Sequence, residues 1–194
     1  RPSKRIRGSI AAMIVDIARG VRNDPAGLRL GAAIELIQNH LLIIDDVMDG
    51  STMRRGSVAA HVAYEQDFPY ARGRESEMVG ILIGMIAKHT SSLLLLDSAD
   101  PRDNSRAALA VLERSTIITD LGQIDDLDQQ LGREVSTDAM LKKYAQKSSY
   151  YTFVAPIEAA LALVYGAQPQ HRKDAESYGL PAGIAFQLRD DYLG

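Results

Sequence analysis

Three carboxylates and two guanidinium groups lie within eleven residues of one another in this sequence. Asp45, Asp46 and Asp49 stand at the end of an apolar run, and Arg54 and Arg55 follow them. On a helix Asp45 and Asp49 would share one face and repel each other unless a cation lay between them. Carboxylates suit Mg²⁺, which is usually shared with substrate phosphates, and guanidinium groups match phosphate oxygens. The stretch predicts a diphosphate held through Mg²⁺; the simpler interpretation is an acidic helix end followed by a basic loop.

A second acidic cluster lies at the far end of the sequence. Gln187, Asp190 and Asp191 fall within the stretch GIAFQLRDDYLG. Residues three apart share a face of a helix, so Gln187 and Asp190 would point the same way. The stretch therefore predicts a second helix that carries polar side chains on one face.

These two stretches and three others resemble the motifs of the trans-polyprenyl diphosphate synthases, the family of geranylgeranyl and farnesyl diphosphate synthases. The acidic matches are DDVMDGSTMRRG and GIAFQLRDDYLG; the others are KRIR at Lys4–Arg7, GQIDD at Gly122–Asp126 and KSSYYT at Lys147–Thr152. One motif would be weak support, whereas five in the family's order are strong support. The resemblance implies an all-α bundle around a central cavity, formed by one domain over residues 1–194 that lacks the family's terminal helices.

The reaction that this resemblance implies is a head-to-tail prenyl transfer. An allylic diphosphate ionises, the double bond of isopentenyl diphosphate attacks the allylic cation, and loss of a proton gives a longer trans-prenyl diphosphate. Mg²⁺ together with Arg and Lys side chains would stabilise the departing diphosphate. An apolar cavity would keep water away from the carbocation.

By matching positions, the resemblance implies Mg²⁺ ligands on two facing walls. Asp45 and Asp49 would bind the ion from one wall, with Asp46 in support. Asp190 would bind it from the other wall, with Asp191 behind it. The residues that the resemblance implies for catalysis are Asp45, Asp49, Arg54, Lys147 and Asp190.

The resemblance also implies a site for the allylic diphosphate. Arg54, Lys147 and Gln187 would hold it, and Ser148 supplies a hydroxyl where the family usually has threonine. The GQIDD stretch at Gly122–Asp126 matches a supporting polar cluster in the cavity. Taken alone, each match has a simpler interpretation, such as a surface lysine for Lys147; the ordered set makes those interpretations improbable together.

A second site, for isopentenyl diphosphate, is implied at Lys4, Arg7 and Arg55. Gln38 occupies a position where many family members have a histidine that helps to bind this substrate. Its amide is expected to donate one hydrogen bond. The simpler interpretation of Lys4 and Arg7 is a solvated basic helix start.

Other positions also depart from the family's pattern. Ile44 replaces a frequent histidine, Gly84-Met85 stands where Gly-Asp is common, and Gly194 replaces the last aspartate of the second acidic motif. His40 and Leu41 occupy the positions that limit product length in the family, and neither is Phe or Tyr. We therefore expect geranylgeranyl diphosphate as the main product, with farnesyl diphosphate or longer products left open.

Two other classes of function stay open. One is a regulatory subunit that has lost catalysis and acts on an active partner, which Gln38 and Met85 favour but the intact acidic and basic residues oppose. The other is a class I terpene cyclase, which shares an aspartate-rich metal site. A cyclase would not need Lys4, Arg7 and Arg55 for a second diphosphate.

Composition narrows the remaining possibilities. The 194 residues are 46% hydrophobic and 24% charged, with a net charge of −3, so no basic field favours nucleic acid. The sequence has no cysteine, which fits a cytoplasmic protein without disulfides. No uninterrupted apolar run approaches the roughly 18 residues that span a bilayer, so we expect no membrane span. A homodimer is expected from the resemblance.

Apolar residues recur at three- and four-residue steps along most of the chain, which is typical of helices. We expect a loop at residues 50–56 and no strands. A helix from Ser136 or Thr137 should run for about 30 residues and bend at Pro156. The other predicted helices are residues 5–19, 27–49, 58–66, 75–97 and 103–130, a short one that ends at Tyr178, and residues 181–193.

Overall fold

The computed structural model describes residues 4–132 and 136–193, and the all-α prediction is confirmed. A small hairpin of β1 (Met53–Arg54) and β2 (Ser57–Val58) joins the helices. The helical elements are α1 (Ile6–Arg19), α2 (Pro25–Met48), α3 (Ala60–Asp67), α4 (Arg74–Leu96), α5 (Ser105–Gln130), α6 (Thr137–Tyr144), the π-helix η1 (Ala145–Val154), α7 (Ala155–Tyr165) and α8 (Pro169–Leu193).

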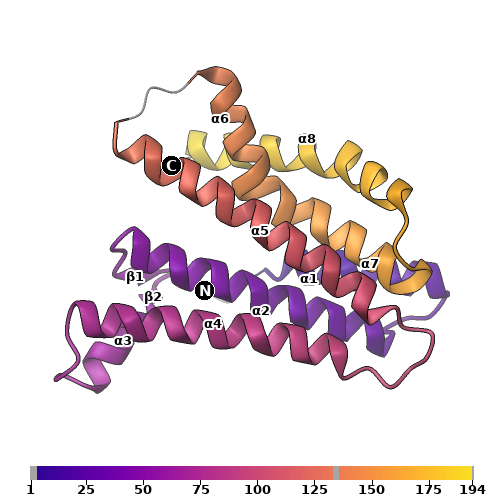
Figure 1. Ribbon diagram of the computed structural model, residues 1–194, viewed down its shortest axis with the longest axis horizontal. Coiled ribbons are helices and arrows are strands. Elements are labelled where there is room, and N and C mark those ends of the chain that lie inside the picture. The colour runs from indigo at the N-terminus through magenta and orange to yellow at the C-terminus, as the bar shows by residue number, and fades with distance from the viewer. Residues whose placement is uncertain (1–3, 133–135, 194) are drawn as a thin grey trace.

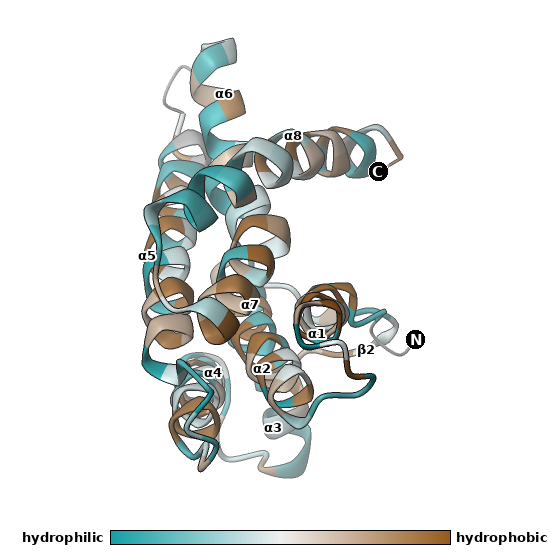
Figure 2. Cartoon of the chain, turned by 90° about the vertical axis from the view of Figure 1, so that its right-hand side faces the viewer, coloured by the Kyte–Doolittle hydropathy of each residue, from teal (hydrophilic) through white to brown (hydrophobic). Residues whose placement is uncertain are grey.

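Helix α2 is the element around which the bundle packs. It lies against α1 on one side and α4 on another (Figure 1). The elements α6, η1 and α7 follow one another as a continuous helical segment that packs against α5 and α8. The core is built from small and branched apolar side chains of α1, α2, α5 and α7. Brown segments mark hydrophobic residues along these helices in Figure 2. Leu30 on α2 and Leu163 on α7 are almost fully buried in this core. The end of α2 that carries the first acidic motif is thereby held on a rigid support.

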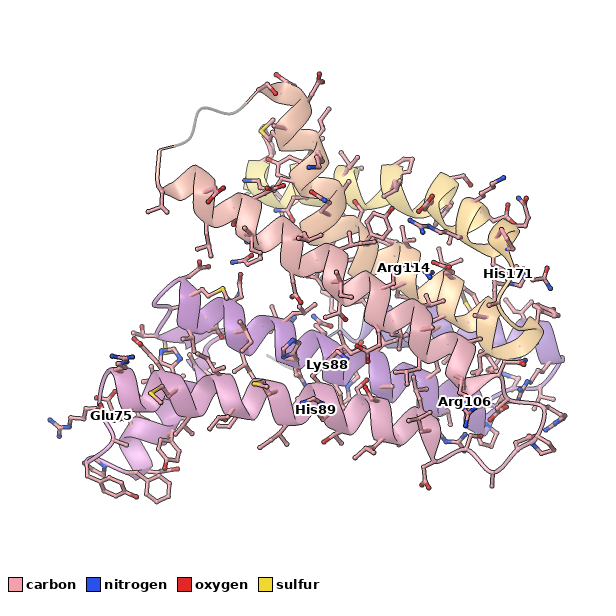
Figure 3. All side chains as sticks on the ribbon, viewed as in Figure 1. Glu75, Lys88, His89, Arg106, Arg114 and His171 are labelled. Atoms are coloured by element: carbon pink, nitrogen blue, oxygen red, sulfur yellow. The ribbon has the colours of Figure 1, made fainter. Side chains whose placement is uncertain are left out.

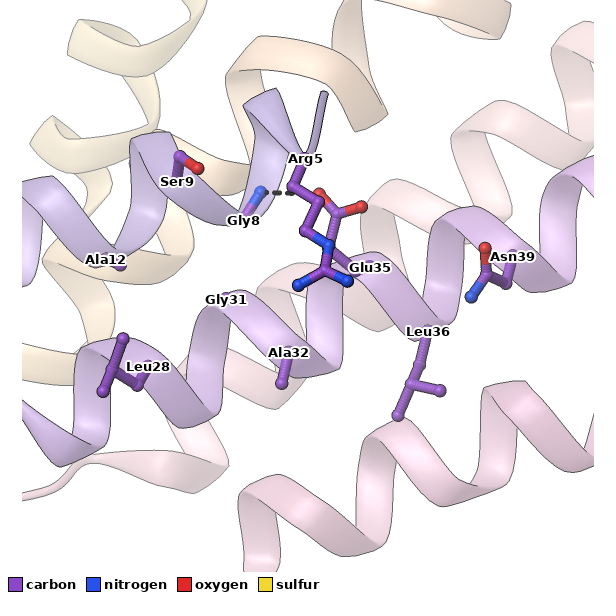
Figure 4. Close-up of a pocket in the computed structure, with 10 residues that line it drawn as sticks. All are labelled: Arg5, Gly8, Ser9, Ala12, Leu28, Gly31, Ala32, Glu35, Leu36 and Asn39. Atoms are coloured by element: carbon purple, nitrogen blue, oxygen red, sulfur yellow. Dashed lines mark hydrogen bonds between the residues drawn. The ribbon is translucent and has the colours of Figure 1, made fainter. Parts of the chain in front are cut away.

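Glycines let α1 and α2 approach closely. A Cβ on Gly8 would lie 2.6 Å from the carbonyl oxygen of Gly31, so neither position has room for a side chain. The Gly8 amide also donates to Glu35 Oε1 at 3.0 Å. A groove lies outside this contact (Figure 4), and its described lining residues include Glu35 as their one carboxylate. Among its described lining residues, this groove therefore lacks the pair of carboxylates expected of the predicted Mg²⁺ and diphosphate site.

The loop predicted for residues 50–56 is wrong in part, because it contains the hairpin. Met53 pairs with Val58 and Arg54 with Ser57. The two residues between the strands, Arg55 and Gly56, both have positive φ angles, 54° and 81°. Such a pair is typical of the type I′ turn that matches the twist of a hairpin. Strands of two residues are too short to produce a visible alternation in the sequence.

The helix of about 30 residues predicted from Ser136 is confirmed in its cap and length, because Ser136 caps a helical run that ends at Tyr165, but it is not a single α-helix. The chain forms α6, then a ten-residue π-helix, then α7. Pro156 lies in the first turn of α7, where its missing N–H group needs no helical partner. The change in helical winding therefore precedes the proline. It falls on the Lys147–Thr152 motif, and π-helical turns are frequent at functional sites.

Three glycines of neighbouring helices pack their backbones directly onto η1. A Cβ on Gly122 of α5 would lie 2.7 Å from the Lys147 amide nitrogen, and one on Gly179 of α8 would lie 2.7 Å from Val154 Cγ2. A Cβ on Gly183 would overlap Ser149. These contacts bring the GQIDD motif and the second acidic motif to the same helix as Lys147.

Helix α8 corrects a further prediction, because it continues through Pro181 where two helices were expected. The proline has no N–H to donate, which weakens one turn. Ser149 Oγ donates to the carbonyl of Leu180 at 3.3 Å, next to the proline. Close packing on η1 thus holds both halves of α8 in line.

Replacing Gly183 with alanine should lower the free energy of unfolding by about 1–3 kcal/mol, the usual effect of overpacking. The added methyl group would meet the Ser149 backbone, which cannot move without shifting η1. Denaturant unfolding would measure the change. Gly84→Ala is the matched control, because there the nearest atom is the movable Ile44 Cδ1 at 3.1 Å. Equal stability of the two variants would contradict the proposed backbone contact.

Two helices, α2 and α4, are long and apolar enough to cross a membrane by length and composition alone. This is weak evidence, because core helices of soluble proteins pass the same test. The expected absence of a membrane span therefore stays a prediction. In α4 only 22% of the most apolar stretch is buried within this chain, so much of its apolar surface lacks cover here.

Candidate active site

A cavity of about 560 Å³ lies between α2, α5, η1 and α8. Part of its wall is apolar, with Leu41 and Ile44 from α2 and Ile124 from α5. The polar and ionisable residues that line it are His40, Asp45, Arg54, Thr119, Asp120, Gln123, Lys147, Ser148, Tyr151 and Gln187. Five residues predicted for catalysis or substrate binding and both predicted length-limiting residues, His40 and Leu41, therefore meet at one cavity; the five are Asp45, Arg54, Lys147, Ser148 and Gln187.

Asp45 is the carboxylate on which the cations of this cavity converge. Arg54 reaches it from the hairpin, with Nη2 3.2 Å from Asp45 Oδ2. Lys147 reaches it from η1, with Nζ 3.6 Å from Asp45 Oδ1. One carboxylate at the end of α2 thus has positive charges from two other elements, separated along the chain by about ninety residues.

Asp46 is buried and faces the hairpin rather than the cavity. Arg54 Nε donates to Asp46 Oδ1 at 2.6 Å, and this hydrogen bond raises the pKa of Arg54. The same guanidinium therefore fastens the hairpin to α2 and faces Asp45. This contact fits the supporting role predicted for Asp46.

Lys147 is also held by Asp126 of the GQIDD motif, with Nζ 2.5 Å from Asp126 Oδ2. Burial by itself would lower the pKa of Lys147. The hydrogen bond to Asp126 and the charges of Asp45 and Asp49 raise this pKa by a larger amount, so the net shift is upward. Burial raises the pKa of Asp126, whereas hydrogen bonds from Lys147 and Lys143 lower it overall. The lysine therefore stays positively charged beside the cavity.

Sequence reasoning missed the part played by Lys143. Its Nζ lies 2.9 Å from Asp126 Oδ1, so Asp126 is shared by two lysines. Lys143 and Lys147 are four residues apart, and that spacing on one helix face was the available signal. The next residue of η1 also makes a contact at this cavity, because Ser148 Oγ donates to Gln187 Oε1 at 2.6 Å. This bond links the Lys147 motif to the second acidic motif.

Gln38, Arg7 and Arg55 form a second polar group. Gln38 is buried, and its amide is oriented by its neighbours: the oxygen accepts from Arg7 Nη1 and Arg55 Nη2, each at 3.1 Å. The amide oxygen thus gathers two guanidinium groups, and the expectation that the NH₂ group donates one hydrogen bond stays a prediction. Arg7 Nη2 donates to Thr152 Oγ1 at 2.8 Å, and its guanidinium lies 4.3 Å from the centre of the Tyr151 ring. Lys4, also predicted here, is exposed.

Asp49 and Asp190 lie outside the residues that line the cavity, and both are exposed. Asp190 is one turn beyond Gln187 on α8. Within the described residues, no three His, Cys, Asp or Glu side chains are grouped closely enough to hold a metal by themselves. The Asp191 side chain and Gly194 lie outside the described part. That Asp190 faces Asp45 across a metal ion stays a prediction.

The donor set at the end of α2 fits Mg²⁺ all the same. This ion keeps several waters and commonly takes only one or two carboxylates, with substrate phosphates completing its shell. Asp45 and Asp49 provide hard oxygen donors four residues apart, and Asp49 is near enough for its charge to act on Lys147. A preformed cage of three carboxylates is not required for such a site.

An all-helical bundle with carboxylates, cations and an apolar cavity at one place has the architecture of an isoprenoid synthase. The chain belongs to the polyprenyl synthetase family, which it matches over residues 1–194. The resemblance inferred from the five motifs is thereby confirmed.

Among its relatives is a short chain isoprenyl diphosphate synthase of Methanothermobacter thermautotrophicus, 31% identical over 190 residues, which are 98% of this chain and 54% of that protein. A geranylgeranyl diphosphate synthase of Sulfolobus acidocaldarius is 29% identical over 194 residues, again 98% of this chain and 54% of that protein. The chain thus spans about half the length of the relatives that it matches.

Solved structures agree with this placement. A geranylgeranyl pyrophosphate synthase from Corynebacterium glutamicum, complexed with isoprenyl diphosphate and magnesium, superposes with a TM-score of 0.80 at 28% identity, covering 100% of this chain and 56% of that one. A geranylgeranyl pyrophosphate synthetase from Geoglobus acetivorans gives 0.81 at 25% identity, covering 98% and 57%. The isoprenoid synthase fold is therefore shared along the whole described chain.

Proposed function

We propose that this protein is a prenyltransferase that condenses isopentenyl diphosphate with an allylic diphosphate. Its product would be a short-to-medium trans-prenyl diphosphate, with geranylgeranyl diphosphate foremost. The observation that carries the proposal is the convergence of Arg54 and Lys147 on Asp45 beside a partly apolar cavity. Such a site offers cations to a diphosphate and apolar walls to a hydrocarbon tail.

At the allylic site, Arg54 and Lys147 would bind the diphosphate and stabilise the charge that grows on it as the allylic C–O bond breaks. Gln187 and Ser148 would add hydrogen bonds from α8 and η1. Asp45 and Asp49 would hold Mg²⁺, with Asp46 in support and Asp190 contributing from α8. When bound, the ion would supply further positive charge to the leaving diphosphate.

Arg7 and Arg55, gathered by Gln38, would bind the second diphosphate, with Lys4 nearby in sequence. The double bond of isopentenyl diphosphate would attack the allylic cation to form the new C–C bond, and a proton would then leave. Leu41, Ile44 and the other apolar lining residues would exclude water from the cation. The presence of this second group of cations favours condensation over cyclisation of a single substrate.

The first test uses the purified protein with isopentenyl diphosphate, allylic starters and Mg²⁺, and sizes the products after removal of phosphate. We expect product only when both substrates are present, and loss of turnover when EDTA removes the metal. Restoring Mg²⁺ should restore turnover, which controls for unfolding by the chelator.

Three results would contradict this proposal. Turnover of an allylic diphosphate without isopentenyl diphosphate would indicate a terpene cyclase. Turnover that appears only after addition of a partner protein would indicate a regulatory subunit. A dominant product of C30 or longer would refute the expected chain length.

The apolar surface of α4 supports a homodimer. Leu82, Ile86 and Leu93 of α4 are each more than half exposed. Large exposed apolar patches usually mark interaction surfaces. We propose a second copy of this chain as the partner and a cytoplasmic location; light scattering coupled to size exclusion would test the dimer.

A further inference from the structure

One region of the cavity wall is ionisable rather than apolar. His40 of α2 and Asp120 of α5 both line it. His40 lies five residues before Asp45, about 7.5 Å along the helix, and Asp120 lies six residues before Asp126, about 9 Å. Since Lys147 contacts both Asp45 and Asp126, these two positions of α2 and α5 lie side by side at the diphosphate site. His40 and Asp120 are therefore at similar depths below the diphosphate site.

These two residues belong to an ionisable cluster that also involves α4. Burial lowers the pKa of His40, whereas Lys88 of α4 brings a positive charge near Asp120. Lys88 is largely buried, with Nζ 2.6 Å from Glu113 Oε1, and Ser92 Oγ donates to Glu113 at 3.0 Å. His40 Nδ1 lies 3.0 Å from the carbonyl oxygen of Gly84 on α4. Figure 3 labels Lys88 and His89 on the stretch of α4 that runs alongside α2.

Asp120 nevertheless keeps contact with solvent in the open cavity. Protein around it raises the pKa of its carboxyl by burial, although the charges of His40 and Lys88 act in the opposite direction. A hydrocarbon tail that reached this depth would displace the remaining water. Removing water from a carboxylate without a new hydrogen bond is strongly unfavourable, and the gain from burying one more isoprene unit opposes it only in part.

The cavity wall near Asp120 has no bulky aromatic ring among its described lining residues that would block a growing tail by size. Among the described lining residues, the one phenol ring belongs to Tyr151, and it lies against the Arg7 guanidinium at the isopentenyl diphosphate site. Between the diphosphate site and Asp120, the apolar lining residues include Leu41, Ile44 and Ile124. A growing tail would therefore meet apolar side chains first and the ionisable cluster afterwards.

We propose that Asp120, with His40 and Lys88, sets the length of the product by polarity rather than by bulk. Chain growth stops where one more isoprene unit would strip water from this carboxylate. Asp120 is thus a residue that determines product length, and the end of the hydrocarbon tail would lie beside it. The inference rests on the proposed prenyltransferase function.

Asp120→Leu separates the two explanations because leucine is larger than aspartate and apolar. We call the Asp120 region of the cavity wall its floor. If this floor limits the product by size, the variant should make shorter products. If it limits the product by polarity, the main product should be longer by at least one isoprene unit. Asp120→Asn keeps the size and removes the charge, and it should shift the products in the same direction by less. Asp174→Leu on α8, where exposed Asp174 accepts from Gln170, is the control and should leave the distribution unchanged.

Binding of unreactive substrate analogues tests the role of Asp120 in limiting tail length without any need for turnover. Unreactive thiolodiphosphates with prenyl tails of increasing length would be titrated calorimetrically into the wild-type protein and both Asp120 variants. We expect affinity to stop rising with tail length in the wild type and to continue rising in Asp120→Leu. Unchanged affinities and products in both variants, or shorter products from Asp120→Leu, would overturn the inference. Absence of condensation by the wild type would instead refute the proposed function, and the binding series would still decide on the floor.

Discussion

Asp45→Asn is expected to lower kcat/KM for prenyl condensation by at least about 1000-fold, equivalent to about 4 kcal/mol of transition-state stabilisation. The substitution keeps the size of the side chain and removes the charge on which Arg54 and Lys147 converge. A neutral amide is also a weak Mg²⁺ donor, so the metal contribution of several kcal/mol should fall with it. Steady-state kinetics over a range of Mg²⁺ concentrations would measure both effects.

Asp174→Asn provides the control for Asp45→Asn. It removes a carboxylate of the same size from α8, where exposed Asp174 accepts from Gln170. Its kinetics should stay close to those of the wild type. A loss of less than tenfold in Asp45→Asn, or an equal loss in the control, would show that Asp45 does not act at the reacting diphosphate.

Lys147→Met should lower kcat by about 100- to 1000-fold, the usual effect of removing one charge-stabilising donor. Lys147 links Asp126, Asp45 and the cavity, and its positive charge lies where the leaving diphosphate would develop negative charge. Because the net shift of its pKa is above the ordinary 10.5, deprotonation of Lys147 should not limit activity near neutral pH. The pH profile of kcat would check this.

The control for this variant is Lys142→Met, which removes an exposed lysine from the neighbouring helix. It should leave kcat unchanged. If Lys147→Met raised KM and left kcat intact, the lysine would bind the substrate and the transition state equally and would not stabilise the developing charge. The effects of Lys147→Met and Asp45→Asn should not add, because the two side chains contact one another.

Local periodicity was sufficient to predict most of the helices. The first helix was expected at residues 5–19 and α1 is Ile6–Arg19; the fourth was expected at 75–97 and α4 is Arg74–Leu96. The motifs likewise brought Asp45, Lys147 and Gln187 to one cavity. These features depend on residues close in the chain or on patterns that the whole family carries.

The features that were missed depend on contacts between distant segments. The π-helix follows from the packing of Gly122 and Gly183 onto η1, and α8 continues through Pro181 because the same packing holds it straight. The ionisable floor at Asp120 arises only when α2, α4 and α5 are brought together. Local sequence carries no signal for any of these, since each requires knowledge of which backbone lies opposite.

The type I′ turn of the hairpin has a consequence for how this loop can vary. Arg54 lies in a strand and points back to Asp46, whereas Arg55 occupies the turn and reaches Gln38. Neighbouring side chains along a strand point to opposite faces. A one-residue insertion before Arg54 would therefore turn its side chain away from Asp46 and displace Arg55 from the turn, so both proposed diphosphate sites would lose a guanidinium group. Homologues should tolerate changes of residue type in this loop far better than changes in its length.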